Sequence, residues 1–265
     1  MPDPERPAPH LLILGGEDVA AALAAAVAER FGDRLAVTYS LAGRTTPARL
    51  PPGRVRSGGC GGAEGLAAFL RAEAVTAVIV ATHPFAAAIS RNARLACDAA
   101  GVPRLCLRRP EWQPQPGDRW LMADTAAEAA AALPGLATRV LLTLGTADLA
   151  PFAALPGIAF VVRMIAAPPQ PPLPGCTVVT GRGPFDAEAE TDLLRRHRID
   201  AVVTKASGGG ATDAKLVAAR ALGLPVVMIR RPPPEPGPAV EDVGAVLEWL
   251  DRIGARSDNP PAQES

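Results

Sequence analysis

Lysine and aromatic residues are scarce in this sequence. Lysine occurs only at positions 205 and 215, and aromatic residues make up 4% of the 265 residues. So few aromatic side chains exclude a stacking surface for single-stranded nucleic acid. Basic and acidic residues number 27 each. The chain therefore lacks the positive footprint of a nucleic-acid-binding protein, and it has no acidic tail.

Long hydrophobic runs are also missing. No apolar run reaches the roughly 18–20 residues that a spanning helix needs, and the first ten residues lack the pattern of a signal peptide. We therefore expect a cytoplasmic protein with no membrane association. The cysteines at positions 60, 97, 106 and 176 contain no C-x-x-C pair, which argues against a zinc site or a thioredoxin-like motif and predicts four free thiols.

What the sequence does contain is short apolar runs that alternate with alanine-rich helical segments. This alternation predicts an α/β fold of two Rossmann-like, doubly wound parallel-sheet domains with an interdomain cleft. The proline-rich segment 109–119 has no periodicity and marks the crossing between domains. We place the first domain at residues 1–112, the second at 113–253 and a polar tail at 254–265.

The first two predicted strands end in residues that suit a dinucleotide. Gly15 and Gly16 follow the strand 11–14 and would allow a pyrophosphate to approach the backbone. The next strand ends at Ser40, with Arg44 and Thr45 close behind and no acidic residue. An arginine here accommodates the 2′-phosphate of NADP. The alternatives are an ordinary tight turn and a solvated surface arginine.

Three further segments carry candidate site residues. The glycine-rich segment 58–62 could be covered by a flat ligand or could simply be a flexible loop. Thr82, His83 and Pro84 follow the strand 77–81, where function concentrates in this architecture, although they could instead cap the next helix. Lys205 opens a second glycine-rich loop, 207–210, which has the form of an anion-binding loop.

The ordered set of motifs resembles one family. It comprises I-L-G-G (13–16), S-L-A-G-R-T (40–45), G-G-C-G-G (58–62), A-T-H-P-F-A (81–86), I-S-R-N-A (89–93), R-P-E-W (109–112), G-R-G-P-F (181–185), K-A-S-G-G (205–209) and L-G-L-P-V-V-M (222–228). Together these motifs resemble the precorrin-6A reductases of cobalamin biosynthesis, over about residues 11–231. The sequence departs from the family pattern at Glu17-Asp18 and at Ala206.

The resemblance implies an oxidoreductase that uses NADPH to reduce one double bond of the ring-contracted tetrapyrrole precorrin-6A, giving precorrin-6B without a metal. The first domain would bind NADPH, and the second would contribute to cofactor and tetrapyrrole binding. Catalytic roles would fall to Lys205 and His83. The cofactor-binding residues would be Gly15, Gly16, Ser40, Gly43, Arg44, Thr45, Gly59, Thr82, His83, Pro84, Ser207, Gly208 and Gly209. The substrate carboxylates would meet Arg91, Arg163 and Arg182.

Three alternatives remain open from the sequence. The chain could be a reductase of the cobalt-containing form of precorrin-6A, or a nucleotide- or tetrapyrrole-binding protein without turnover. It could also be a transferase that binds a sugar nucleotide between two α/β domains. The sequence does not specify a protein partner.

Overall fold

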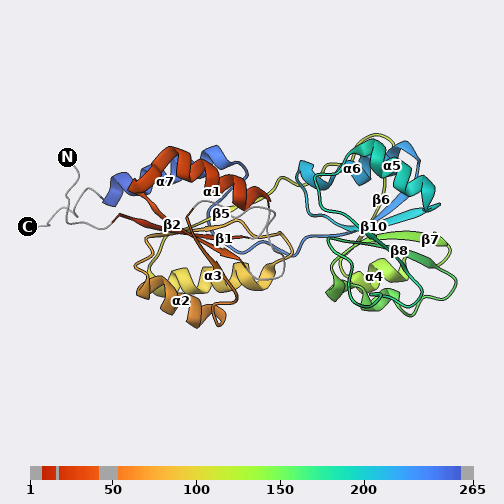
Figure 1. Ribbon diagram of the computed structural model, residues 1–265, viewed down its shortest axis with the longest axis horizontal. Helices are drawn as coiled ribbons and strands as arrows, with labels where there is room; N and C mark the ends of the chain where they lie inside the picture. Colours follow the sequence, from red (N-terminus) through yellow and green to blue (C-terminus); the bar gives the residue numbers. More distant parts are fainter. Residues whose placement is uncertain (1–7, 16–17, 42–52, 258–265) are drawn as a thin grey trace, which may run out of the picture. The chain divides into compact units, whose positions relative to one another are not determined.

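The computed structural model describes residues 8–15, 18–41 and 53–257. The chain forms two units, one made of Met1–Arg109 with Pro232–Ser265 and the other of Pro110–Arg231. Each unit is built on one six-stranded sheet (Figure 1), and every strand pair in both sheets is parallel. The predicted α/β class with two Rossmann-like units is confirmed.

The first sheet has the strand order β12-β5-β4-β1-β2-β3. Its strands are β1 (His10–Leu14), β2 (Ala36–Leu41), β3 (Arg54–Ser57), β4 (Ala77–Val80), β5 (Arg104–Leu107) and β12 (Ala239–Val240). The helices α1 (Asp18–Phe31) and α7 (Val243–Ser257) lie on one face, and α2 (Gly62–Ala72) and α3 (Ala87–Ala100) lie on the other (Figure 1).

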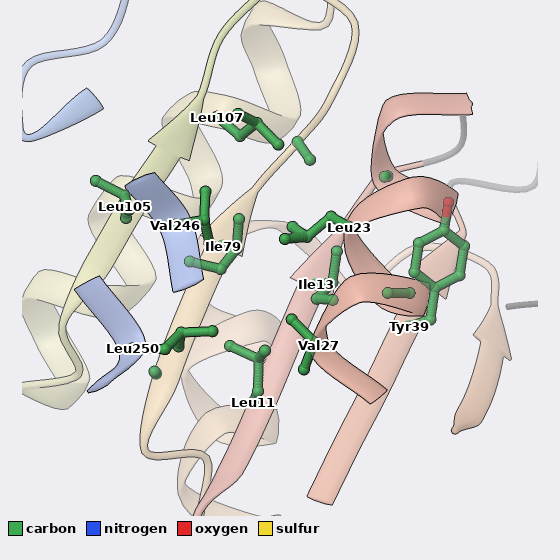
Figure 2. Packing of buried hydrophobic residues seen from close by; sticks show 14 of the residues in the cluster. Leu11, Ile13, Leu23, Val27, Tyr39, Ile79, Leu105, Leu107, Val246 and Leu250 are labelled. Carbon is green, nitrogen blue, oxygen red and sulfur yellow. The ribbon is translucent and has the colours of Figure 1, made fainter. Parts of the chain in front are cut away.

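Side chains along β1 point alternately to the two faces of the sheet, and each face has its own hydrophobic core. Leu11 and Ile13 pack under α1 and α7, as Figure 2 shows. Leu12 and Leu14 point to the opposite face and pack with residues of α2 and α3. All four side chains are almost completely buried. A central strand covered on both faces must be apolar throughout, which explains the uninterrupted run of apolar residues in this strand.

The second sheet has the strand order β6-β11-β10-β7-β8-β9. Its strands are β6 (Arg119–Ala123), β7 (Arg139–Thr143), β8 (Ala159–Met164), β9 (Thr177–Thr180), β10 (Ala201–Lys205) and β11 (Pro225–Ile229). The helices α5 (Ala187–Arg196) and α6 (Ala214–Ala221) cover one face, and α4 (Ala126–Ala131) covers the other (Figure 1). Asp186 caps α5 by accepting hydrogen bonds from the backbone N–H groups of Glu188 and Ala189, at 2.9 and 3.0 Å.

The end of the chain lies in a different unit from the one expected. The sequence prediction placed residues 113–253 together in the second domain, but the chain returns to the first unit at Pro232. There β12 pairs with β5, and Val246 and Leu250 of α7 complete the core beside Leu105 (Figure 2). The apolar face of α7 covers the first sheet, which α1 alone leaves partly open. Residues 254–257, expected in a polar tail, belong to α7.

All four cysteines are free thiols, and Cys97 and Cys106 are buried. Burial raises the pKa of the Cys97 thiol to about 11. Within the described ranges, no helix is long and apolar enough to cross a membrane.

Candidate functional site

The carboxyl edge of the first sheet collects most of the predicted site residues of that unit. Because the strands are parallel, their carboxyl ends meet at one edge, where ligands bind in this class of fold. Gly15 follows β1, Ser40 lies near the end of β2, and Thr82 and His83 follow β4. The strands β1 and β4 are neighbours from which the chain winds outward in opposite directions. Gly15 and His83 therefore flank the topological switch point of this sheet.

Gly15 occupies a position that has no room for a side chain. A Cβ atom there would lie 2.5 Å from the Cβ of Ala20 and 2.8 Å from the carbonyl oxygen of Ala81. The backbone N–H of Gly15 donates to the carbonyl of Ser40 at 3.2 Å. The glycine thus lets the turn after β1 pack closely against α1 and the end of β4, as the first turn of a dinucleotide fold requires. Gly16 lies outside the described residues.

Ser40 is 7% exposed, and its hydroxyl accepts a hydrogen bond from Nη1 of Arg56 at 2.9 Å. Arg56 lies directly opposite Ser40 in the pairing of β2 with β3. The other residues predicted at the end of β2, Gly43, Arg44 and Thr45, lie outside the described residues. Gly59 lies in the exposed glycine-rich segment that joins β3 to α2.

The segment after β4 has a defined local geometry. The hydroxyls of Thr82 and Ser90 are 3.1 Å apart. Nδ1 of His83 accepts from the backbone N–H of Phe85 at 3.2 Å, so a neutral His83 ring carries its proton on Nε2. His83 and Pro84 are partly buried, whereas Arg91 on α3 is exposed.

The second sheet places Lys205 at its own switch point. Lys205 ends β10, which pairs with β7 on one side and β11 on the other. Its ammonium group donates to Asp148 at 2.6 Å. Asp148 belongs to a short 3-10 helix, Thr146–Asp148, just beyond β7. The predicted catalytic lysine is therefore charge-paired within its own unit.

The loop after Lys205 is held by donors that take up its carbonyl groups. Arg231 donates to the carbonyls of Ala206 and Ser207, at 2.7 and 3.0 Å. The indole N–H of Trp112 donates to the carbonyl of Gly209 at 2.7 Å. Gly208 has φ +66°, and a Cβ there would collide with Arg231 and with the carbonyl of Pro110. These contacts restrain the backbone of the loop.

A group of buried charges lies beside this loop. Arg163 on β8 forms an ion pair with Glu190 on α5 at 2.8 Å, and the two side chains are 8% and 3% exposed. The Arg163 guanidinium also stacks 4.5 Å from the centre of the Phe185 ring. Lys215 on α6 is 5% exposed. Arg163, which we expected to bind substrate, is thus already engaged inside the unit, whereas Arg182 is exposed.

Lys215 interacts electrostatically with this pair. The pKa of Lys215 is lowered to about 8, mainly by burial and also by the nearby Arg163, while the carboxylates of Glu190 and Asp213 act in the opposite direction. The ammonium group lies 4.8 Å from the centre of the Trp112 ring and donates to the carbonyl of Thr212. Lys215 therefore connects the charge cluster to the loop that follows Lys205.

Sequence analysis missed several residues at these edges, namely Arg56, Asp148, Glu190, Lys215, Trp112 and Arg231. Arg56 lies on β3, a strand of only four residues that the sequence pattern did not predict. Charged residues on α5 and α6 look like solvated helix faces in the sequence. The scarcity of lysine was the one signal that could have drawn attention to Lys215.

Each unit has one six-stranded sheet of parallel strands with helices on both faces. This arrangement defines an α/β protein of two Rossmann-like units. Residues 10–251 match the family model described as precorrin-6x reductase CbiJ/CobK. The chain belongs to this family of oxidoreductases.

Individual relatives and a solved structure agree with this assignment. The chain is 51% identical over 248 residues to a precorrin-6A reductase of Rhodococcus erythropolis. The aligned region covers 93% of this chain and 99% of the relative. It is 31% identical over 201 residues to a cobalt-precorrin-6A reductase of Priestia megaterium, over 71% of this chain and 77% of the relative. The solved structure of a CobK precorrin-6A reductase matches with a TM-score of 0.86 and 41% identity, over 93% of this chain and 97% of that one.

Proposed function

We propose that this chain catalyses the NADPH-dependent reduction of one double bond of precorrin-6A to give precorrin-6B, in cobalamin biosynthesis. The observation that carries the proposal is the nearly full-length relationship to a precorrin-6A reductase at 51% identity. The relative named for the cobalt-containing substrate is less similar and matches over less of the chain. This difference favours the metal-free tetrapyrrole as the substrate.

The residues at the carboxyl edge of the first sheet fit a nicotinamide dinucleotide. Gly15 allows close packing at the first turn, and Ser40 and Arg56 place a hydroxyl and a guanidinium at the end of β2. When bound, NADPH supplies a hydride. In the proposal the turn at Gly15 approaches the pyrophosphate, and Thr82, His83 and Pro84 lie at the nicotinamide end. The predicted contacts of Gly16, Gly43, Arg44 and Thr45 belong to the same proposal, as does that of Gly59.

The loop of the second unit provides a second set of groups in this proposal. In this proposal the loop of Ser207, Gly208 and Gly209 receives an anionic group. The backbone N–H groups of Ser207 and Gly209 donate to the carbonyls of Lys205 and Pro110, at 2.7 and 3.3 Å, and would have to turn toward the anion. The substrate is a polycarboxylate, and the exposed guanidinium groups of Arg91 and Arg182 can bind carboxylates in bidentate fashion. Arg163 could contact the substrate only if its pair with Glu190 opened.

An anaerobic assay with purified protein tests the proposed reaction. We expect oxidation of NADPH that depends on precorrin-6A, with NADH a poorer donor and cobalt-precorrin-6A a poorer acceptor. A matched titration with nucleotide sugars should show no binding. Binding of NADPH or the tetrapyrrole without turnover would support the non-catalytic alternative instead, and faster reduction of the cobalt form would change the assigned substrate.

His83 carries the catalytic prediction that is simplest to test. If its Nε2–H donates a hydrogen bond that orients the reacting group in the transition state, His83→Ala should lower kcat by about a hundredfold, the low end of what losing one such donor costs. The thermal midpoint should stay close to that of the unmodified protein. His197→Ala, at the end of α5, is the matched control and should leave kcat unchanged. Full kcat in folded His83→Ala would show that His83 has no catalytic role.

A further inference from the structure

Several contacts hold the side chain of Arg56 at the carboxyl edge of the first sheet. Its Nη1 donates to the hydroxyl of Ser40 at 2.9 Å and lies 2.7 Å from the sulfur of Cys60. Its Nη2 donates to the carbonyl of Gly59 at 3.4 Å. The guanidinium carbon lies 4.9 Å from the centre of the Phe69 ring on α2. The aromatic ring and the loop carbonyl thus hold the guanidinium beside Ser40.

Arg56 differs from Arg54 in its electrostatic partners. Arg54, two residues earlier on β3, forms an ion pair with Glu73. Among the described residues, no carboxylate lies within ion-pair distance of Arg56. A guanidinium that is fixed in position but has no counter-charge favours an anion from outside the protein.

The hydroxyl of Ser40 adds a second donor at the same place. Because its oxygen accepts from Arg56, its own O–H proton is available to another acceptor. Two guanidinium N–H groups and one hydroxyl form the donor set that a phosphate monoester requires. The end of the second strand is also where a dinucleotide fold receives the adenine ribose.

We propose that Arg56, together with Ser40, binds the 2′-phosphate of NADPH and determines the preference for NADPH over NADH. This inference rests on the proposed use of a nicotinamide dinucleotide at the first sheet. Stacking on Phe69 fixes the plane of the guanidinium before the cofactor arrives, so little side-chain freedom is lost on binding. Arg56 is thus a specificity-determining residue rather than a catalytic one.

Two nucleotides that differ only in the 2′-phosphate test this role. Titration calorimetry compares adenosine 2′,5′-bisphosphate with adenosine 5′-monophosphate on the full-length protein. We expect Arg56→Ala to weaken the bisphosphate by about tenfold to a hundredfold, the usual effect of losing charge-assisted hydrogen bonds. The monophosphate should change by less than about twofold, because it lacks the group that Arg56 binds. Arg56→Lys should recover part of the loss, since it restores the charge but not the planar fork.

Arg54→Ala is the matched control. This arginine lies on the same strand and the same face, but its charge is already paired with Glu73, so the variant should bind both nucleotides like the unmodified protein. Equal weakening of both nucleotides by Arg56→Ala would overturn the inference, and so would an unchanged preference for the bisphosphate. If Arg56→Ala does not fold, the test uses the ratio of the two nucleotide affinities of Arg56→Lys. An Arg56→Lys ratio equal to that of the unmodified protein would overturn the inference.

The outcome for the unmodified protein separates this inference from the function on which it rests. If the unmodified protein does not prefer the bisphosphate, the proposed use of NADPH over NADH fails, and Arg56 loses its role with it. If the unmodified protein prefers the bisphosphate and the Arg56 variants keep that preference, NADPH use stands. The 2′-phosphate is then bound by other residues.

Discussion

Glu190→Ala is expected to lower the free energy of unfolding by about 3–5 kcal/mol, the usual result of removing one partner of a buried ion pair. Glu190 and Arg163 are 2.8 Å apart, and their side chains are almost completely buried. Without the carboxylate, the guanidinium of Arg163 stays in a region of low dielectric with no counter-charge. Lys215, which interacts with both residues, would then retain Asp213 but lose one of its two carboxylate partners.

Chemical denaturation at neutral pH measures this effect. Glu188→Ala serves as the control, because Glu188 lies on the same helix but is exposed, and it should change stability by less than about 1 kcal/mol. The double variant Arg163→Met/Glu190→Leu should recover most of the loss, since apolar residues of similar size often replace a buried ion pair without penalty. A Glu190→Ala variant as stable as the control would show that water enters the cluster and screens the pair.

The stability contributed by Lys215 is expected to increase with pH. Its pKa is about 8 in the folded chain, against an ordinary value of 10.5. Below about pH 8 the ammonium group of Lys215 is charged in the folded and in the unfolded chain, and burial of that charge destabilises the folded chain. Between about pH 8 and pH 10.5 the unfolded chain holds a proton on Lys215 that the folded chain has lost. The free energy of unfolding therefore rises with pH over this range.

The comparison with Lys215→Met isolates this effect, because all other titrating groups are the same in both proteins. From about pH 7 to pH 10, the unfolding free energy of the unmodified protein should rise by about 2–3 kcal/mol relative to that of the variant. Denaturation curves at several pH values provide the measurement. Parallel stability profiles would mean that Lys215 titrates at its ordinary value and is more hydrated than its burial indicates.

The local pattern of the sequence was enough to predict most of the individual elements. The sequence pattern predicts helices at 18–31 and 187–196 and strands at 177–180 and 225–229. The structure has α1, α5, β9 and β11 at these bounds. These elements could be predicted because their signals are local. An apolar run between turn residues indicates a buried strand, and an acidic start with a basic end indicates a helix. The short strands β3 and β12 and the exposed strand β6 have no such signal, and they were missed.

The sequence also predicted that Gly15, Ser40, Thr82 and His83 lie at one edge of a sheet, because the carboxyl ends of parallel strands all lie at the same edge. Only the tertiary structure decided which sheet the final helix covers. The amphipathic pattern of residues 243–257 predicts a helix with one buried face, but it does not show which of the two sheets that face covers. The pairing of β12 with β5 and the burial of Val246 and Leu250 assign it to the first unit.

Charge pairing was likewise decided by tertiary structure. Arg163 and Arg182 were both expected to bind substrate, and Arg56 was not among the predicted site residues. Whether an arginine meets a carboxylate depends on residues far away in the chain: Glu190 is brought to Arg163 by the packing of α5 on its sheet, and no acidic residue among those described is brought to Arg56. The sequence by itself therefore determined the fold class and the edge that holds the predicted site. The distant contacts determined which of the charged groups there remain open to a ligand.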